Sequence, residues 1–588
     1  MMTRFPVLII LASIALGSLP QQEKDRKALH FVTEPNIRAI SLTVTEHDPK
    51  AIAPGYWFVA PLVNSKVPLP EDREYAPLKT GAQIYNRNGD LVWSMQDQPM
   101  PQVHSFQPVY VNGSQQLTLV VQQSGLLDAG RLGVTAGIVM NDHFEQIARV
   151  VTKGENIHQD FHEFHLDHSG RTAIVAARFL SNHNEKDSGN GNSGFQEIDL
   201  LTGEGTFQWN ALSAGVGFDE SHPTVQRLPP RTTTTATTPD FFHLNSVDKD
   251  ADGDYLVSAR HTSTIYKISR IDGSIIWRLG GTKSDFTLTP DVTFHFQHDA
   301  RFRFENSTHT IISLLDNAVP PHKSRHEEEH EQHPQTPQSF GKIILLNHDT
   351  RSATLLRHFP RPHNLPSRKM GNLQTLGKNP LTSNVLINWA SPSGISEFDS
   401  RNRLILDASL AGGTVTSYRV FKAPFVGRPL RPPVMTVLPA VHGWDGKGRS
   451  ATFYMSWNGA TDVRGWRICI SNDEEVEGTF EVVAEISKRG FETAWSLVSG
   501  KSGQRAFVEA IDASGDVLGK SETSQMPGWH GEQEREQEDD IDTGGAHWAL
   551  RWTLYAWAMY GLWTAAHQTL VLYRRAGRRR GGGYKLLQ

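Results

Sequence analysis

Cysteine is nearly missing from this 588-residue chain, in which Cys469 is the only one. A single thiol excludes an internal disulfide, so the fold depends on its own core. The long middle of the chain also lacks helical periodicity. A phosphate-cradling loop is missing too, because Gly500-Lys501-Ser502 has no upstream glycine and no following helix. These absences disfavour a disulfide scaffold, a helical bundle and a P-loop enzyme.

Negative charge exceeds positive charge in the chain as a whole, but not at the C-terminus. The net charge is −5, yet six basic residues follow Tyr573, so the rest of the chain is strongly acidic. Nucleic-acid binding needs a basic face, and the composition therefore argues against a nucleic-acid partner.

The two ends of the chain carry its apolar runs. Residues 1–20 have the pattern of a signal peptide, with Arg4 ahead of a short apolar stretch. Residues 552–573 predict a transmembrane helix, preceded by an acidic stalk at 527–551 and followed by a basic cytosolic tail at 574–588. We therefore expect a single-pass type I membrane protein with a luminal or extracellular body. The alternative for 552–573 is an amphipathic helix packed on the body.

Secretion agrees with two glycosylation sequons, at Asn112 and Asn306. Sequons also occur by chance, so they add little to the prediction of a secreted glycoprotein.

The middle of the chain reads as repeated antiparallel hairpins. Runs rich in Ile, Val, Leu and Tyr flank an x-Gly dipeptide, a typical hairpin turn. The clearest turns are Asn88-Gly89, Ser169-Gly170, Thr202-Gly203, Asp252-Gly253 and Asp272-Gly273. Such units close economically as a β-propeller, which we place at residues 30–430 with six blades. The rival architecture is a pair of β-sandwiches.

A smaller β-module is expected at residues 432–526. Regular strands separated by turns, with Trp457 and Trp466 as core anchors, predict a β-sandwich of fibronectin or immunoglobulin type.

Three polar segments interrupt this pattern. The Thr-rich 231–239 and the His- and Glu-rich 320–337 are expected to be surface loops. A metal site in the second is the less favoured alternative, because it lacks a fixed ligand framework. The Asp-rich run 248–254 could bind calcium, but it lacks the flanking helices and the final Glu of an EF-hand, so a tight hairpin turn is favoured. We expect no metal and no cofactor.

The richest polar segment lies between Phe241 and Arg303. It carries His243-Leu244-Asn245, Arg260-His261 and His298-Asp299-Ala300-Arg301, while His162 begins an earlier hairpin. Residues at the ends of a propeller's innermost strands converge on its central channel. These side chains are therefore expected to meet although they are distant in sequence.

At these residues the chain resembles the arylsulfotransferase family, particularly its fungal branch. The strings that carry the resemblance are HEFHLDHSG, FHLNSV, SARHTSTIYKI, IIWRLGG, FQHDARF and NVLINWASPSGISEFD, and the likeness spans about residues 75–425. It implies a six-bladed propeller that transfers a sulfuryl group from a phenolic sulfate ester to a phenol, without the nucleotide sulfate donor.

The resemblance also implies roles for single residues. His298 matches the histidine that is transiently sulfated, and His243, Arg260 and His162 match the remaining catalytic set, with His158 and His165 near enough to blur the last match. Asn245, His261 and Arg301 are expected to bind substrate. Neutral imidazole is a good nucleophile and leaving group, and arginine can donate two hydrogen bonds to sulfuryl oxygens.

Two other functions remain open. A membrane-anchored propeller can serve as a non-catalytic binding or adhesion module. A quinone-dependent dehydrogenase would also use a propeller, but the chain shows no recurring tryptophan-docking signature.

Overall fold

The computed structural model describes most of the chain between residues 28 and 526. The described ranges are 28–63, 81–96, 102–122, 135–180, 192–226, 240–318, 338–411, 415–439, 451–471, 479–497 and 505–526. The expected signal peptide, both polar loops (231–239 and 320–337), the stalk, the transmembrane helix and the basic tail lie outside these ranges. Within them, no helix combines the length and apolarity needed to cross a membrane.

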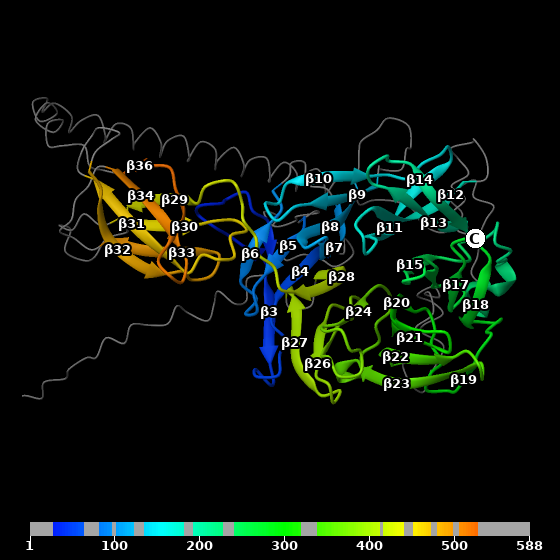
Figure 1. Ribbon diagram of the computed structural model, residues 1–588. Helices are drawn as coiled ribbons and strands as arrows, with labels where there is room; N and C mark the ends of the chain where they lie inside the picture. Colours follow the sequence, from blue (N-terminus) through cyan, green and yellow to red (C-terminus); the bar gives the residue numbers. More distant parts are fainter. Residues whose placement is uncertain are drawn as a thin grey trace, which may run out of the picture. The chain divides into compact units, whose positions relative to one another are not determined.

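The prediction of an all-β protein is confirmed. The helical segments in the described ranges are single turns: α1 (Pro223–Gln226) and two 3₁₀ turns (Phe218–Glu220 and Pro362–Asn364). Three four-stranded antiparallel sheets follow one another along the chain (Figure 1). They are β7–β10 (Gln102–Val111, Ser114–Gln122, Thr135–Met140, Gln146–Val150), β11–β14 (Ile157–Leu166, Thr172–Phe179, Ser193–Asp199, Gly205–Asn210) and β15–β18 (Leu244–Lys249, Tyr255–Ala259, Thr264–Ile268, Ile275–Gly280).

The next two sheets are larger. The first contains β20–β23 (His298–Glu305, His309–Asp316, Phe340–Asn347, Ser352–Pro360) and the short parallel strand β19 (Thr287–Leu288). The second has nine strands: β24–β28 (Asn372–Thr375, Val385–Asn388, Ile395–Phe398, Leu404–Leu410, Val415–Ala423), β4–β6 (Tyr56–Val63, Gln83–Tyr85, Leu91–Ser94) and β3 (Leu42–Glu46), which pairs with β27. A two-stranded sheet, β1 (Ala28–Leu29) with β2 (Ala39–Ile40), precedes them.

The x-Gly dipeptides form the predicted hairpin turns. They connect β5 to β6, β11 to β12, β13 to β14, β15 to β16 and β17 to β18. At Gly170 the need for glycine is direct, because φ is +68° and an added Cβ would lie 1.9 Å from Cγ1 of Val111. The Asp-rich run 248–254 is likewise a hairpin turn, in which Lys267 Nζ lies 2.9 Å from Asp250 Oδ2.

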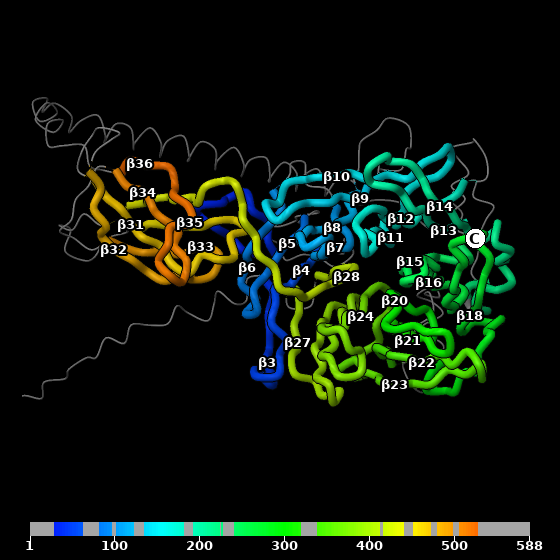
Figure 2. The backbone as a smooth tube through the Cα atoms, viewed as in Figure 1, coloured from blue at the N-terminus to red at the C-terminus, as the bar shows by residue number. Residues whose placement is uncertain are grey.

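Six strands from the five sheets that contain β3–β28 contact one another around a common centre, as Figure 1 shows; four are edge strands of separate sheets, and β24 and β28 belong to the same nine-stranded sheet. In order around this ring they are β7, β11, β15, β20, β24 and β28, and β28 in turn contacts β7. Figure 2 follows the backbone through the same circuit. Side chains on these inner strands can therefore meet at the centre although they come from residues 102–423.

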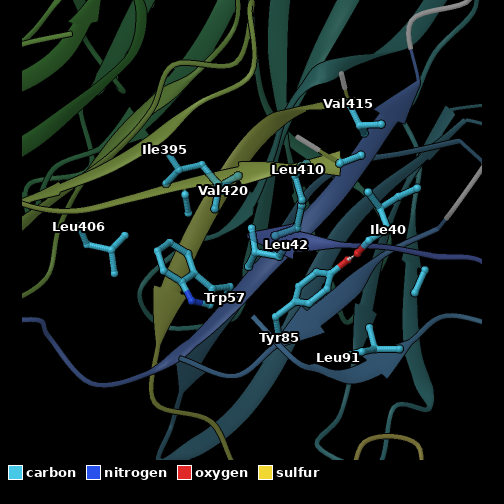
Figure 3. Packing of buried hydrophobic residues seen from close by; sticks show 14 of the residues in the cluster. Ile40, Leu42, Trp57, Tyr85, Leu91, Ile395, Leu406, Leu410, Val415 and Val420 are labelled. Carbon is cyan, nitrogen blue, oxygen red and sulfur yellow. Dashed lines mark hydrogen bonds between the residues drawn. The ribbon is translucent and has the colours of Figure 1, made fainter. Parts of the chain in front are cut away.

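The ring is closed by pairing strands from the two ends of this region. β28 is antiparallel to β4, with Val420 opposite Val59 and Lys422 opposite Trp57. Around this seam Trp57, Tyr85, Leu410 and Val420 pack in a buried cluster (Figure 3), where the Tyr85 hydroxyl donates to Ile40 O at 2.5 Å. Burial of several such side chains contributes roughly 2 kcal/mol each.

Residues 434–525 form two further antiparallel sheets. They are β29, β30 and β33 (Val434–Pro439, Ala451–Ser456, Glu492–Leu497), and β32, β31, β34, β35 and β36 (Glu481–Ser487, Gly465–Ser471, Arg505–Ile511, Val517–Lys520, Ser524–Gln525). Trp466 is buried in them and Trp457 is half-buried. Asn458 holds this region to β6, since its amide accepts from Ser94 N and donates to Ser94 O, both at 2.9 Å.

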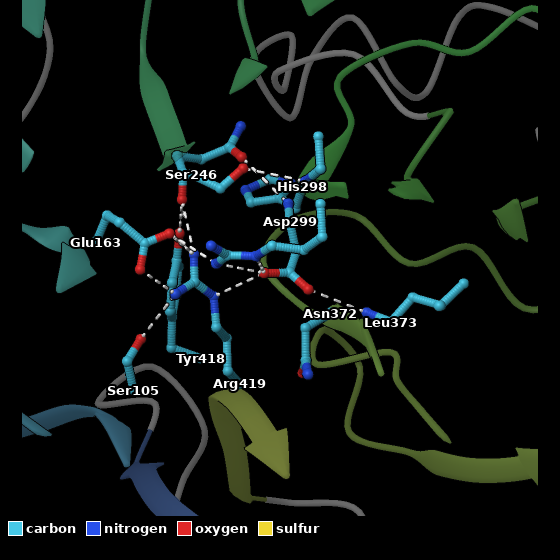
Figure 4. Close-up of polar contacts among 12 residues, drawn as sticks. Ser105, Glu163, Ser246, His298, Asp299, Asn372, Leu373, Tyr418 and Arg419 are labelled. Carbon is cyan, nitrogen blue, oxygen red and sulfur yellow. Dashed lines mark hydrogen bonds and ion pairs between the residues drawn. The ribbon is translucent and has the colours of Figure 1, made fainter. Parts of the chain in front are cut away.

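A buried ion network lies at the centre of the ring (Figure 4). Arg419 donates to both oxygens of Glu163, at 2.9 and 3.1 Å. Arg301 donates to Glu163 at 2.6 Å and to Asp299 at 2.8 Å, and Arg419 Nε lies 3.3 Å from Asp299. Although burial opposes ionisation, the two guanidinium groups hold the pKa of Glu163 well below its usual value.

This network reaches all six inner strands. Glu163 is on β11, Asp299 and Arg301 are on β20, and Arg419 is on β28. Further bonds join the network to the remaining three strands: Arg419 to Ser105 Oγ on β7 and to Asn245 O on β15, Arg301 to Val247 O on β15, and Leu373 N on β24 to Asp299. The network therefore fixes the inner strands relative to one another.

We expect Glu163→Ala to be strongly destabilising, because it leaves two buried guanidinium groups without their shared carboxylate. The loss should be about 3–5 kcal/mol, measured as a drop in the urea midpoint of unfolding. Glu485→Ala is the control, since it removes a partly exposed partner of Arg467 at 3.3 Å and should change the midpoint little. Equal midpoints for the two variants would contradict the central role of Glu163.

Candidate functional site

Irregularities in the inner strands coincide with the polar side chains that meet at the centre of the ring. The pairing register shifts between His104 and Gln107 in β7, between Gln159 and Phe164 in β11, and between residues 244 and 246 in β15. It shifts again between residues 298 and 301 in β20 and between 417 and 420 in β28. A β-bulge re-aims the side chains around it, which explains why site residues cluster at these points.

Four of these five strands supply a site residue followed by a residue that belongs to the ion network or, for Ser105, is bound to it. The pairs are His104-Ser105, His162-Glu163, His298-Asp299 and Tyr418-Arg419. The network thus fixes the backbone directly beside four site side chains.

The structure brings the four expected catalytic residues together. The ring centroids of His162 and His243 are 5.0 Å apart, and Tyr418 lies 5.6 Å from His162 and 6.5 Å from His298. Arg260, His243 and His162 are all close enough to lower the pKa of His298. The predicted convergence of residues 162, 243, 260 and 298 is therefore present.

Arg260 is a buried cation without a carboxylate partner. Within the described ranges no Asp or Glu forms an ion pair with it, and its Nε–H has no hydrogen-bond acceptor. Nη1 donates to His261 Nε2 at 2.8 Å, and the guanidinium lies 5.4 Å from the Phe296 ring centroid. Burial lowers the pKa of Arg260 to about 10. A buried guanidinium with a free donor suits an anionic ligand.

His261 holds Arg260 in place. Its Nδ1 donates to Asp240 O at 2.6 Å, which leaves the Nε2 lone pair to accept from Arg260. Burial lowers the pKa of His261 to about 3, so the ring is neutral. Both ring nitrogens are engaged within the protein, although this residue was expected to bind substrate.

His162 and His243 are each oriented by a carboxylate. His162 Nδ1 bonds Asp160, whose other oxygen accepts from Arg178 at 2.5 Å, and His243 Nδ1 bonds Asp240 at 2.6 Å. Among the described residues, neither Nε2 has a hydrogen-bond partner. Each Nε2 can therefore bond a ligand at the centre of the ring.

Neighbouring histidines are placed differently from His162. His158 is exposed, and His165 lies 3.7 Å from Glu163 rather than beside His243. Of the three histidines near this position, His162 is the one in contact with the other candidate residues.

His298 is buried and presents one nitrogen for reaction. Nδ1 donates to Asn317 Oδ1 at 2.7 Å, and Met370 N approaches Nε2 at 3.3 Å. Burial, followed by the nearby charge of Arg260, puts the pKa of His298 well below its ordinary value. The neutral ring therefore carries its lone pair on Nε2.

Asn245 and Arg301 form hydrogen bonds with the residues that flank His298 in the sequence. The Asn245 amide donates to Gln297 O at 2.8 Å and accepts from Asp299 N at 3.3 Å. Arg301 donates its hydrogen bonds to Glu163, Asp299 and Val247 O. Direct substrate binding by these two stays a prediction, while their observed contacts position the His298 backbone.

Several site residues escaped the sequence analysis. Asp160 and Asp240 precede their histidines by two and three positions, and this spacing could have suggested them. Tyr418 and Asn317 gave no such signal: Tyr418 is on β28, far along the chain from the His-rich segment, and Asn317 directly follows β21, where no motif marks it. His104 was also missed; it stacks on Phe161 at 4.3 Å with both ring nitrogens buried and without hydrogen-bond partners.

Asp240, His243 and His261 could be considered as metal ligands, because their ligand atoms lie within 4.8 Å of one another. Both nitrogens of His261 are already engaged, and Arg260 lies 2.8 Å from one of them. A positive neighbour at that distance opposes a divalent cation. The cluster therefore fits an anion better than a metal.

His104 should make stability depend on pH. Burial lowers its pKa to about 4 from an unfolded value near 6.5, so the unfolded state binds more protons between these values. Stability is then fully present above about pH 6.5 and falls as the pH drops toward 4. In His104→Phe, the loss of stability between pH 7.5 and 5.0 should shrink by about 2 kcal/mol.

Urea unfolding at the two pH values measures this effect, with His358→Phe as the control at an exposed position. A pH dependence in His104→Phe equal to that of the wild type would contradict the prediction.

The described fold is an antiparallel β-protein with a buried site of histidines and one unpaired arginine. Residues 138–411 match the family model described as arylsulfotransferase (ASST). This range contains every expected catalytic residue and lies within the 75–425 span of the resemblance. The match is to the family as a whole, so the fungal branch stays a prediction.

The other comparisons found only weak similarities. No curated protein matches the chain. A Bacteroides caccae protein of unknown function is 10% identical, with 63% of this chain and 99% of that chain covered and a TM-score of 0.35. Virginiamycin B lyase from Staphylococcus aureus is 8% identical (62% and 88% covered, TM-score 0.27), and a Lactobacillus plantarum protein is 10% identical (76% and 100% covered, TM-score 0.28). These low scores carry no argument about function.

Proposed function

We propose that this protein transfers a sulfuryl group from a phenolic sulfate ester to a phenol through a sulfurylated His298. One observation carries the proposal: a buried guanidinium without a carboxylate partner, Arg260, lies near the neutral imidazole of His298, whose Nε2 lone pair accepts only a long bond of 3.3 Å from Met370 N–H. The match of residues 138–411 to the arylsulfotransferase family supports the same chemistry.

In the first half-reaction the ester's sulfuryl oxygens bind Arg260 through its free Nε–H. The His298 Nε2 lone pair attacks sulfur, and the bond between sulfur and the phenolic oxygen breaks as the N–S bond forms. The departing oxygen takes a proton from a neighbouring histidine. His243 is suited to this role, because its side chain is 26% exposed and pairs with Asp240, whereas burial lowers the pKa of His162.

In the second half-reaction an acceptor phenol enters the vacated place. His243 takes the phenolic proton, the phenolic oxygen attacks sulfur and the N–S bond breaks. This returns His298 to its neutral form and His243 to its protonated form, so no additional reactant is needed. Arg260 stays charged throughout and stabilises the sulfuryl oxygens in both transition states.

We further propose that the six inner strands belong to six blades of a propeller. The closed order of contacts from β7 to β28, and the pairing of β28 with β4, support this reading. The sequence supports a type I anchor at 552–573 that keeps the body on the luminal or extracellular side.

Release of 4-nitrophenol from 4-nitrophenyl sulfate, with phenol as acceptor, tests the proposal on the full-length protein. His298→Ala should abolish release, and Arg260→Ala should lower kcat/KM by about 10²- to 10³-fold, the cost of losing a principal anion stabiliser. Arg270→Ala, at an exposed turn, serves as the control. Release by His298→Ala at the wild-type rate would overturn the proposal.

The role of His243 predicts a dependence on the leaving group. Asp240→Asn replaces the carboxylate partner by an amide of the same shape and makes His243 a weaker proton carrier. We expect kcat/KM to fall on the order of tenfold or more for phenyl sulfate, whose leaving oxygen needs the proton. It should change little for 4-nitrophenyl sulfate, and equal losses for both esters would contradict the assignment.

A further inference from the structure

The histidines of the site differ in what accepts their Nδ1–H. His162 and His243 donate to the carboxylates of Asp160 and Asp240. His298 donates instead to the side-chain amide of Asn317, a residue fully buried in the protein. The proposed nucleophile is thus oriented by a neutral partner, whereas the two neighbouring rings are oriented by charged ones.

Asn317 has a single possible orientation. Its Nδ2 donates to Ser367 O at 3.0 Å, to Ser367 Oγ at 3.1 Å and to Met370 O at 3.1 Å. Because carbonyl oxygens only accept, the amide nitrogen must face them and Oδ1 must face His298. His298 therefore carries its proton on Nδ1, and Nε2 holds the lone pair.

An amide partner also limits how strongly the ring binds a proton. A carboxylate at hydrogen-bond distance stabilises imidazolium by its charge, whereas an amide oxygen contributes only its dipole. Arg260 nearby makes a second positive charge on His298 still less favourable. The ring is thus kept neutral where it must attack, and a positively charged sulfuryl-imidazole gains no carboxylate to stabilise it.

From this geometry we infer that Asn317 is a positioning residue that fixes the reactive nitrogen of His298 and keeps the sulfurylated ring labile. The second part of this inference, that Asn317 keeps the sulfurylated ring labile, rests on the proposed function. When Nε2 attacks sulfur, the N–S bond forms, the S–O bond breaks, and the Nδ1 proton stays on the ring, donated to Asn317. When the acceptor attacks, the N–S bond breaks and the same neutral tautomer returns.

The Met370 N–H also takes part in these reaction steps. It points at Nε2 from 3.3 Å in the free site, and Met370 itself has a positive φ of 62°. Once Nε2 bonds to sulfur it can no longer accept, and this N–H becomes available to a sulfuryl oxygen. Asn317 supports this arrangement too, because it binds Met370 O.

The decisive variant is Asn317→Asp, which gives His298 a carboxylate partner. Diethyl pyrocarbonate acylates neutral imidazole, so peptide mass spectrometry of the full-length protein reports protonation of His298 without any sulfuryl transfer. In the wild type the rate at His298, corrected for reagent decay, should stay nearly constant between pH 8 and 5. In Asn317→Asp it should fall on the order of tenfold at the acidic end, because the carboxylate favours imidazolium.

Single turnover with 4-nitrophenyl sulfate provides the second measurement. In Asn317→Asp, sulfurylated His298 should persist about tenfold longer in the presence of phenol, because the carboxylate stabilises the charged intermediate. Asn372→Asp is the matched control: Asn372 is equally buried on an inner strand, but its amide bonds the backbone of Val420. It should leave the acylation profile of His298 unchanged.

The two proposals can fail separately. If the wild type forms no sulfurylated His298 but Asn317→Asp still alters the acylation profile, sulfuryl transfer is wrong and the positioning role stands. If Asn317→Asp and Asn372→Asp both give the wild-type profile, the role of Asn317 is overturned. Should Asn317→Asp fail to fold, the wild type still decides, because titration of His298 between pH 5 and 8 would overturn the inference.

Discussion

A buried carboxylate shared by two arginines is the constraint on which the rest of the structure depends. Glu163 binds Arg301 and Arg419, and Asp299 completes the network. Charges in an apolar interior are tolerated only with close partners, so each inner strand must deliver its group to one point. That requirement fixes the relative positions of the strands more tightly than apolar packing, which tolerates small shifts.

Charge compensation also separates structural groups from functional ones. Arg301 and Arg419 have carboxylate partners at the centre of the ring, and Lys422 pairs with Glu397 at 2.8 Å near the closing seam. Arg260 has none among the described residues. Buried Arg361 also lacks one, but the carbonyls of Pro366 and Pro392 accept from it, whereas the Arg260 Nε–H has no acceptor, which supports the anionic ligand proposed above. The distinction arises from partners, since all of these side chains are largely buried.

The sequence allowed the all-β class, the individual hairpins and the meeting of His162, His243, Arg260 and His298 to be predicted, because x-Gly turns and strand-end histidines are local signals. It did not allow the direction of every side chain to be predicted. Asn245 and Arg301 contact the backbone and the ion network beside His298, which the sequence did not indicate, while their expected contact with substrate stays a prediction. Bulges change side-chain direction without leaving a pattern in the sequence, so those residues, and partners such as Asn317, required the structure.

Adjacent residues at the bulges of the inner strands explain how one backbone can serve both stability and the proposed chemistry. In His162-Glu163, His298-Asp299 and Tyr418-Arg419, the first residue faces the site and the second joins the network. These pairs stand at register shifts, and because the two residues of a pair share a peptide bond, a bond that fixes the second residue also limits where the first can go. The charged residues of the network fix the backbone beside the histidines without contacting the rings. The hydrogen-bond partner of each ring then determines which nitrogen faces the site. Rigidity and reactivity are thereby controlled by different residues, one position apart.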